Sequence, residues 1–305
     1  MKLDEISLRF PSLTRTLGKT WLTQNHNWVE DYISTRSELY DLLEVDLRRL
    51  GQLLGLHSLT RCYRDLLRDR ETIWTTFHEI HGVSLLGEIS TSLELKVPRG
   101  DSSKKDFDAR ACIEGTIVNA ECKTRKNEFP FNVPRTVEGP ERIPVHSGSR
   151  ATLDPHDAAD FGIPFEFREN DVSYKPIPES TEVRRTLSSG LDQLPNSGCN
   201  LILFGQFTGS CSDLEDAIFG SPMVYFQTNA ITMRSECFRT RVQTGAFCSG
   251  PVGEPFRQLS AVLWFRLLSV FGPEYRLFLN PTARCPLPDD TVVSLEAVIS
   301  RRTMS

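Results

Sequence analysis

The hydrophobic positions of the first 70 residues recur at three- and four-residue spacings, the pattern of amphipathic helices. The stretch YDLLEVDLRRLGQLLGL shows this pattern best, because charged residues separate its leucines at positions 42, 43, 47, 50 and 54. We therefore predict an N-terminal helical segment over residues 1–70. The helical pattern continues through RETIWTTFHEIHGVSLLGEIS, before two glycines, Gly82 and Gly87, that we expect to weaken the helix.

From residue 91 the period of the pattern changes to an alternation of apolar and polar positions. The stretches TSLELKV, DFDARACI and GTIVNAECKT predict three strands, over residues 91–97, 106–113 and 115–124. The turn Ile113-Glu114-Gly115-Thr116 is short enough to join the second and third strands in a hairpin.

Residues 127–180 have a different character, because the apolar periodicity stops and prolines become frequent. We interpret this segment as an elaborated loop or lid inserted into the domain. After it, STEVRRTLSSGLDQL predicts a helix that starts at a Ser or Thr cap, and NLILFGQF predicts a buried strand. A helix between two apolar strands indicates a βαβ crossover, so part of the sheet is expected to be parallel.

The last third of the chain gives shorter signals. CSDLEDAIF predicts a short helix and PMVYFQTN a strand. SAVLWFRLL and EYRLFLNP predict further strands or a mixture of strand and helix.

Polar side chains gather on one face of the predicted hairpin. Alternation along the third strand points Asn119, Glu121 and Lys123 to the same side. Asp106, at the open end of the hairpin, can approach Glu121, and Asp108 lies on the same face as Asp106. Two carboxylates and an ammonium group would then converge. An ordinary salt bridge on a solvated face is the alternative that such a pattern always allows.

Composition adds limits to this picture. The chain has 305 residues, of which 39% are hydrophobic and 25% charged, as expected for a globular protein. Its net charge of -5 argues against a surface that is basic throughout, but a local basic cleft can still bind nucleic acid. Arginines 48, 49, 61, 64, 68 and 70 crowd the second half of the helical segment, as a solvated face or as a wall facing a phosphate backbone.

The chain shows no sign of a membrane segment. No apolar run approaches about 18 residues, and MKLDEISLRF has acidic residues where a signal peptide needs its apolar core. The eight cysteines are scattered and form no C-x-x-C pair, so we expect reduced thiols. A cytoplasmic location and no membrane partner are the resulting predictions.

The order of these parts resembles the PD-(D/E)xK nuclease superfamily, which has the restriction-endonuclease-like fold. KDFDA stands where the family has Pro-Asp, with Lys105 in place of the proline, and ECK is an intact E-x-K. LDQLPNSGCNLILF looks like the family's next helix and core strand. The resemblance covers about residues 71–207. It implies an α/β fold, with a mixed β-sheet flanked by helices, in a domain over residues 71–305 that carries the Pro-rich insertion.

The resemblance also implies roles for the polar residues of the hairpin. Asp106 and Glu121 would bind a divalent metal, Mg²⁺ or Mn²⁺, through hard oxygen ligands. Lys123 would support the attacking water and the charge that grows on the phosphate, so that Asp106, Glu121 and Lys123 are the predicted catalytic residues. Asp108 is a weaker alternative ligand.

Further residues follow from the same resemblance. Glu79, in the preceding helix, would complete the metal site, although Glu71 and Glu88 lie close by in the sequence. The predicted substrate contacts are on the later helix, at Gln193, Arg184 and Arg185.

The predicted function is a metal-dependent nuclease that hydrolyses phosphodiester bonds of nucleic acid, with DNA favoured over RNA. The alternative is an inactive module of the same fold that binds nucleic acid or a protein partner. Endonuclease or exonuclease action, and a single chain, a homodimer or an accessory subunit, all stay open. The histidine pair His78 and His81 suggests a zinc site, but it is not H-E-x-x-H and no third ligand is evident.

Overall fold

A computed structural model describes residues 3–100, 105–124, 179–207, 211–220, 222–228, 235–241, 245–268 and 272–303. The predicted Pro-rich insertion over residues 127–180 lies outside these ranges, apart from its last two residues.

Helices occupy the first part of the chain, which confirms the prediction for residues 1–70. They are α1 (Leu3–Arg9), α2 (Pro11–Leu17), α3 (Lys19–Thr35), α4 (Ser37–Leu54) and α5 (Leu56–Arg68). In α4 the predicted apolar face is buried at Leu43, Leu47 and Leu50, where α4 packs against α6 (Ile73–Ile89).

Helix α6 runs unbroken through Gly82 and Gly87, so the expectation that these glycines weaken it was wrong. Both glycines let neighbouring side chains come close. A Cβ atom on Gly82 would meet the Leu203 side chain at 3.1 Å, and one on Gly87 would meet the Leu53 side chain at 2.9 Å. Close packing thus outweighs the low helix propensity of glycine.

Six strands form one mixed sheet in the order β1-β2-β3-β4-β7-β8. The first three strands are antiparallel neighbours, β3, β4 and β7 are parallel, and β8 is antiparallel to β7. Helix α8 (Glu179–Leu191) connects β3 to β4, so the predicted crossover and the partly parallel sheet are confirmed. The strands are β1 (Ser92–Pro98), β2 (Asp106–Ile113), β3 (Thr116–Thr124), β4 (Cys199–Gln206), β7 (Ala261–Arg266) and β8 (Glu274–Leu279).

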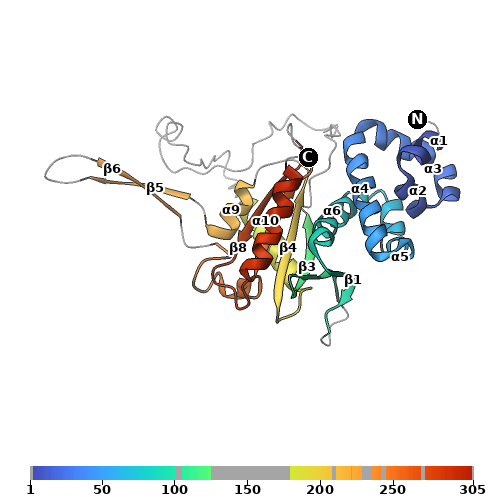
Figure 1. Cartoon of the computed structure of the whole chain (residues 1–305). Coiled ribbons are helices and arrows are strands. Elements are labelled where there is room, and N and C mark those ends of the chain that lie inside the picture. Colours follow the sequence, from blue (N-terminus) through green and yellow to red (C-terminus); the bar gives the residue numbers. More distant parts are fainter. Residues whose placement is uncertain are drawn as a thin grey trace.

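Helices cover both faces of this sheet. Helix α6 packs on one face beside α10 (Asp289–Thr303), and the N-terminal helices lie against α6 on its far side (Figure 1). Helix α8 covers the other face together with α9 (Ser212–Phe219) and the 3₁₀ helix η1 (Glu254–Gln258). The predicted α/β class, with a mixed sheet flanked by helices, is therefore confirmed.

Three elements were not predicted from the sequence: α10, η1 and β6 (Ser235–Arg241). Strand β6 pairs with β5 (Pro222–Thr228) in a separate two-stranded sheet. This hairpin extends away from the six-stranded sheet (Figure 1).

A single cluster of buried hydrophobic side chains includes both Ile6 of α1 and Val298 of α10. The helical segment and one face of the sheet thus share a core, and the domain boundary near residue 70 stays a prediction. Within the described ranges, no helix combines the length and the apolar character needed to cross a bilayer. The seven cysteines with described side chains are free thiols.

Candidate active site

The hairpin of β2 and β3 closes with a two-residue turn, as predicted. Glu114 has φ 49° and Gly115 has φ 76°, the left-handed pair that fits the twist of a tight hairpin. This turn sets the register, and the regular ladder between the strands ends at the pair Ala109 and Ala120. By the same register the next two opposing residues are Asp108 and Glu121.

Side chains replace the backbone ladder where it stops. The Asp108 backbone N–H donates a 3.3 Å hydrogen bond to Glu121 Oε2, and the Cys122 N–H donates a 2.8 Å hydrogen bond to Asp108 Oδ2. The two acidic side chains therefore lie where β2 and β3 separate, each held by the backbone of the opposite strand.

Two further elements bring partners to these carboxylates. Helix α6 supplies Glu79, and β1 supplies Lys96, whose Nζ lies 2.6 Å from Glu79 Oε1 and 2.7 Å from Asp108 Oδ1. Lys123 Nζ donates a 2.6 Å hydrogen bond to Glu121 Oε1. We call Glu79, Lys96, Asp108, Glu121 and Lys123 the carboxylate–lysine cluster.

The cluster has more acidic than basic groups, and it is largely buried. The side chains of Glu79 and Asp108 are each 13% exposed, and that of Glu121 is 3% exposed. Burial and the neighbouring charge of Asp108 raise the pKa of Glu79 to about 7 and the pKa of Glu121 to about 7. With all groups ionised, three carboxylates face two ammonium groups, so one negative charge is not neutralised.

The structure brings together three of the predicted site residues: Glu79, Glu121 and Lys123. The described contacts join Asp108, and not Asp106, to this group. Asp106 begins β2, pairs with Pro98 and is exposed. The geometry therefore favours the alternative ligand Asp108, and the role predicted for Asp106 stays a prediction.

The predicted substrate residues lie at different places around α8. Arg184 and Arg185 are within this helix, half-buried and exposed respectively. Gln193 was expected on the helix but lies in the turn after it, because α8 ends at Leu191. The C-terminal end of α8 is next to the cluster, since a Cβ on Gly190 would lie 3.4 Å from Lys123 Cε.

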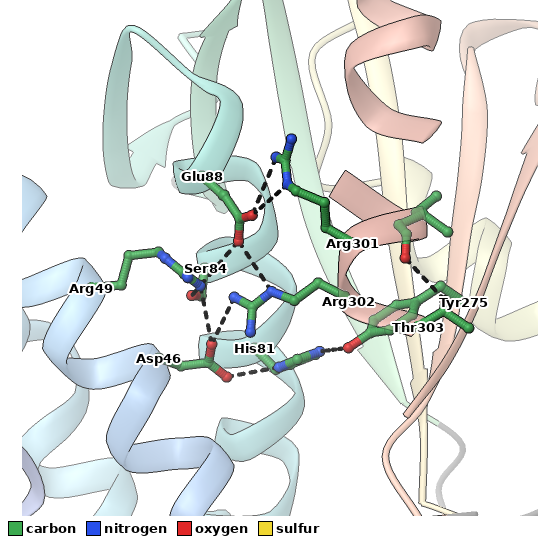
Figure 2. A network of polar contacts seen from close by, with 10 residues as sticks. Asp46, Arg49, His81, Ser84, Glu88, Tyr275, Arg301, Arg302 and Thr303 are labelled. Atoms are coloured by element: carbon green, nitrogen blue, oxygen red, sulfur yellow. Dashed lines mark hydrogen bonds and ion pairs between the residues drawn. The ribbon is translucent and has the colours of Figure 1, made fainter. Parts of the chain in front are cut away.

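Glu88, which was an alternative to Glu79 as a metal ligand, belongs to a different group of charges (Figure 2). It accepts from Arg302 Nε at 3.1 Å and pairs with Arg49 and Arg301 at 3.2 Å each. Arg302 also reaches Asp46, at 3.5 Å. We call this group the arginine network. It joins α4 and α6 to α10. The other alternative, Glu71, is exposed.

The two histidines of α6 do not form a zinc site with each other. His81 Nδ1 lies 2.7 Å from Asp46 Oδ2, and its Nε2 lies 3.0 Å from the hydroxyl of Tyr275 (Figure 2). His78 instead packs its ring against Phe207, and burial lowers the pKa of His78 to about 4. Both histidines are parts of the core between α6 and its neighbours.

Two arginines of the helical segment make contacts within the protein. Arg49 is part of the arginine network, and Arg68 donates to the backbone oxygen of Leu17. Arg61 is exposed and lines a groove of about 340 Å³ between α5 and β1. Lys96 lines the same groove and is the member of the carboxylate–lysine cluster that does so.

Two residues near the acids were not foreseen from the sequence. Lys96 looked like an ordinary polar position of β1, and Tyr63 like an ordinary helix residue. Tyr63 is fully buried, and its burial and the charges of Glu79 and Asp108 raise the pKa of its phenol well above the usual value. Nothing in the local pattern marks either residue, because their proximity depends on how α5 and β1 pack against α6.

Comparison of the chain with protein-family models, with curated protein sequences and with solved structures finds no match. What the site can bind therefore follows from its own side chains.

In the described ranges, no group of three or more His, Cys, Asp or Glu side chains is arranged to hold a metal ion. The cluster still gathers three carboxylates from α6, β2 and β3, and carboxylates are the hard oxygen donors that Mg²⁺ and Mn²⁺ prefer. The carboxylate oxygens suit a divalent cation in their chemistry, although their arrangement in this structure is not that of a metal site. Such a cation would offset the charge of Asp108, which, after burial, raises the pKa of Glu79 and of Glu121.

Proposed function

We propose that the protein is a metal-dependent nuclease with a restriction-endonuclease-like fold, acting on the phosphodiester bonds of nucleic acid, with DNA favoured over RNA. The observation that carries the proposal is the convergence of Glu79, Asp108 and Glu121 with Lys123 where β2 and β3 separate. Buried like charges cost folding energy, and sites of catalysis are where proteins most often retain them.

The order of elements supports the same proposal. Helix α6 is followed by three antiparallel strands, then by helix α8 and by β4, which is parallel to β3. This is the order that the resemblance to the PD-(D/E)xK superfamily implies. The E-x-K sequence lies on β3, at Glu121 and Lys123.

Each residue has a role in the proposed chemistry. Glu79, Asp108 and Glu121 would hold a divalent metal, which supplies a nucleophilic water and neutralises charge on the phosphate. Lys123 is held by Glu121 and presents an ammonium group to the same place, where it can orient the water and stabilise the negative charge of the transition state. Arg184 and Arg185 stay the predicted contacts to substrate phosphates.

One observation favours a second candidate, a module of the same fold that binds nucleic acid without cutting it. Lys96 and the Cys122 N–H already occupy both oxygens of Asp108, and Lys123 occupies one oxygen of Glu121. In an inactive protein these ion pairs would be permanent, and the acids would have only a structural role.

Cleavage of labelled single-stranded and double-stranded DNA and RNA by the purified protein, in Mg²⁺, Mn²⁺ or EDTA, tests the proposal. We expect metal-dependent cutting that Asp108→Asn, Glu121→Gln and Lys123→Met each reduce at least 100-fold, since each removes a group from the reacting centre. Asp106→Asn is the matched control, two residues away on the same strand.

The outcomes separate the alternatives. If Asp106→Asn cuts normally and Asp108→Asn does not, the metal carboxylate is Asp108; the reverse result would return the role to Asp106. Cutting by all variants at the parental rate would refute the site. Absence of cutting, with tight binding of nucleic acid that metal does not affect, would favour the binding module.

A further inference from the structure

Lys96 lies between two acids that come from different elements. Its Nζ is 2.6 Å from Glu79 Oε1 on α6 and 2.7 Å from Asp108 Oδ1 on β2. A cation that bridges two carboxylates takes this position. No other described lysine or arginine pairs with either of these acids.

The backbone of β1 is distorted at this lysine. Lys96 has φ 48°, in the left-handed region that strains the backbone of a residue with a side chain. The strand pairing with β2 skips Lys96 and Asp108 and resumes at Val97 and Phe107. Leu95 packs against the core shared with α6, whereas Val97 packs into the core of the opposite face. Their partners on β2, Ala109 and Phe107, are divided between the same two cores.

Glycine would adopt this backbone without strain, yet the chain has a lysine there. The lysine side chain is then expected to make an interaction that glycine could not make. Its ammonium group partly neutralises two buried acids, which would otherwise repel each other.

Lys96 also has space to move. It is 32% exposed and lines the groove between α5 and β1, together with Ser58 and the exposed Arg61. The other charged residues that line the groove are Arg61 and Glu94, and Glu94 lies 3.8 Å from Arg110. An ammonium group that leaves the two acids would therefore enter a groove that already contains the positive charge of Arg61.

We propose that Lys96 is a displaceable counter-ion, which holds Glu79 and Asp108 in the metal-free protein and turns into the groove beside Arg61 when a divalent metal binds. There it contacts a phosphate of the nucleic-acid strand. The inference rests on the proposed function, and it makes Lys96 a positioning residue that couples metal binding to substrate binding. Lys123 does not have this role, because it pairs with Glu121 alone in the described cluster.

Calorimetric titration with Mn²⁺, in the absence of nucleic acid, tests the first half of the proposal. Lys96→Met removes the competing charge, so we expect it to bind Mn²⁺ at least 10-fold more tightly than the parent protein. Lys105→Met is the matched control, because it changes the net charge equally at an exposed position next to β2. We expect it to change the affinity less than 2-fold.

Lys96→Gly repeats the titration in a background where the left-handed backbone is unstrained, which guards against misfolding of Lys96→Met. Thermal unfolding gives a second measure: Mn²⁺ should raise Tm more in both Lys96 variants than in the parent. DNA binding in Ca²⁺, measured by fluorescence anisotropy, tests the second half. We expect the Lys96 variants to bind at least 3-fold more weakly than the parent.

Three results would count against the proposal in distinguishable ways. Unchanged or weaker Mn²⁺ affinity in both Lys96 variants would overturn the counter-ion role and leave the metal site of the parent intact. Tighter Mn²⁺ binding with unchanged DNA affinity would remove the phosphate contact from the proposal. No Mn²⁺ binding by the parent or by either variant would overturn the proposed metal-dependent function and this inference together.

Discussion

Helix α6 contributes one acid to each of two groups of charged side chains, which differ in their ratio of acidic to basic groups. In the arginine network, Asp46 and Glu88 are surrounded by Arg49, Arg301 and Arg302, so cations outnumber acids (Figure 2). In the carboxylate–lysine cluster the excess is acidic.

Burial, and then the charge of Asp108, raises the pKa of Glu79 and of Glu121 in the cluster. A network in which each acid has at least two arginine partners stabilises the protein as it stands. A cluster with an unmatched charge is stabilised further by an added cation, which suits a site that binds metal. The comparison thus separates a group of charges that holds α4, α6 and α10 together from one whose acidic excess supports the proposed metal site.

The largest expected effect comes from breaking the arginine network. Arg302→Ala leaves the buried Asp46 and Glu88 with fewer cations, so we expect the free energy of unfolding to fall by about 3 kcal/mol. Arg301→Ala is the control, because Arg301 pairs with the same Glu88 but is 55% exposed. It should cost less than about 1 kcal/mol. Chemical denaturation of both variants measures the difference, and equal losses would show that burial of Arg302 is unimportant.

Removal of one acid should have opposite effects in the two groups. In EDTA at pH 8, Glu121→Gln should raise the free energy of unfolding by about 1 kcal/mol, because the ionised carboxylate is unfavourable there. Asp46→Asn should lower it, since Asp46 is 1% exposed and pairs with Arg302 and His81. Urea denaturation of both variants tests the signs. Destabilisation by Glu121→Gln would mean that its ion pair with Lys123 dominates.

The smallest expected effect is the pH dependence of the stabilisation by Glu121→Gln. Glu121 has a raised pKa, so between about pH 4.5 and 7 the folded protein binds more protons than the unfolded chain, and this group stabilises the fold less as pH rises. His78 acts in the opposite direction, because its pKa is lowered. Because both proteins contain His78, its contribution cancels when the free energy of unfolding of the parent is subtracted from that of Glu121→Gln.

We therefore expect the gain from Glu121→Gln to be near zero at pH 5 and to reach its full value by pH 8. Denaturation at pH 5, 6, 7 and 8 in EDTA measures it, and saturating Mn²⁺ should reverse the sign at pH 8. A gain that does not change with pH would contradict the raised pKa of Glu121.

Much of the sheet was predictable because strand alternation and turn chemistry are local signals. The hairpin turn at Glu114 and Gly115 also determines which residues of β2 and β3 lie opposite each other at the site. Counting back from that turn places Asp108, and not Asp106, opposite Glu121. The position of Asp106 near the open end of the hairpin was the less informative signal.

Other features depend on contacts between distant parts of the chain. The left-handed backbone at Lys96 has no local signature, since its neighbours on both sides belong to an ordinary strand. Gly82 and Gly87 were expected to weaken α6, because helix propensity is visible in the sequence and close packing is not. Helix α10 was missed although Leu295 and Val298 have a helical spacing and are buried.

The arginine network has a consequence for synthesis of the chain. Asp46 and Arg302 are 256 residues apart, so the acids of α4 and α6 leave the ribosome long before the arginines of α10. During elongation these early helices carry buried acids without their main cations, and we expect them to stay loosely packed and accessible to chaperones. Docking of α10 then supplies these cations in a later step.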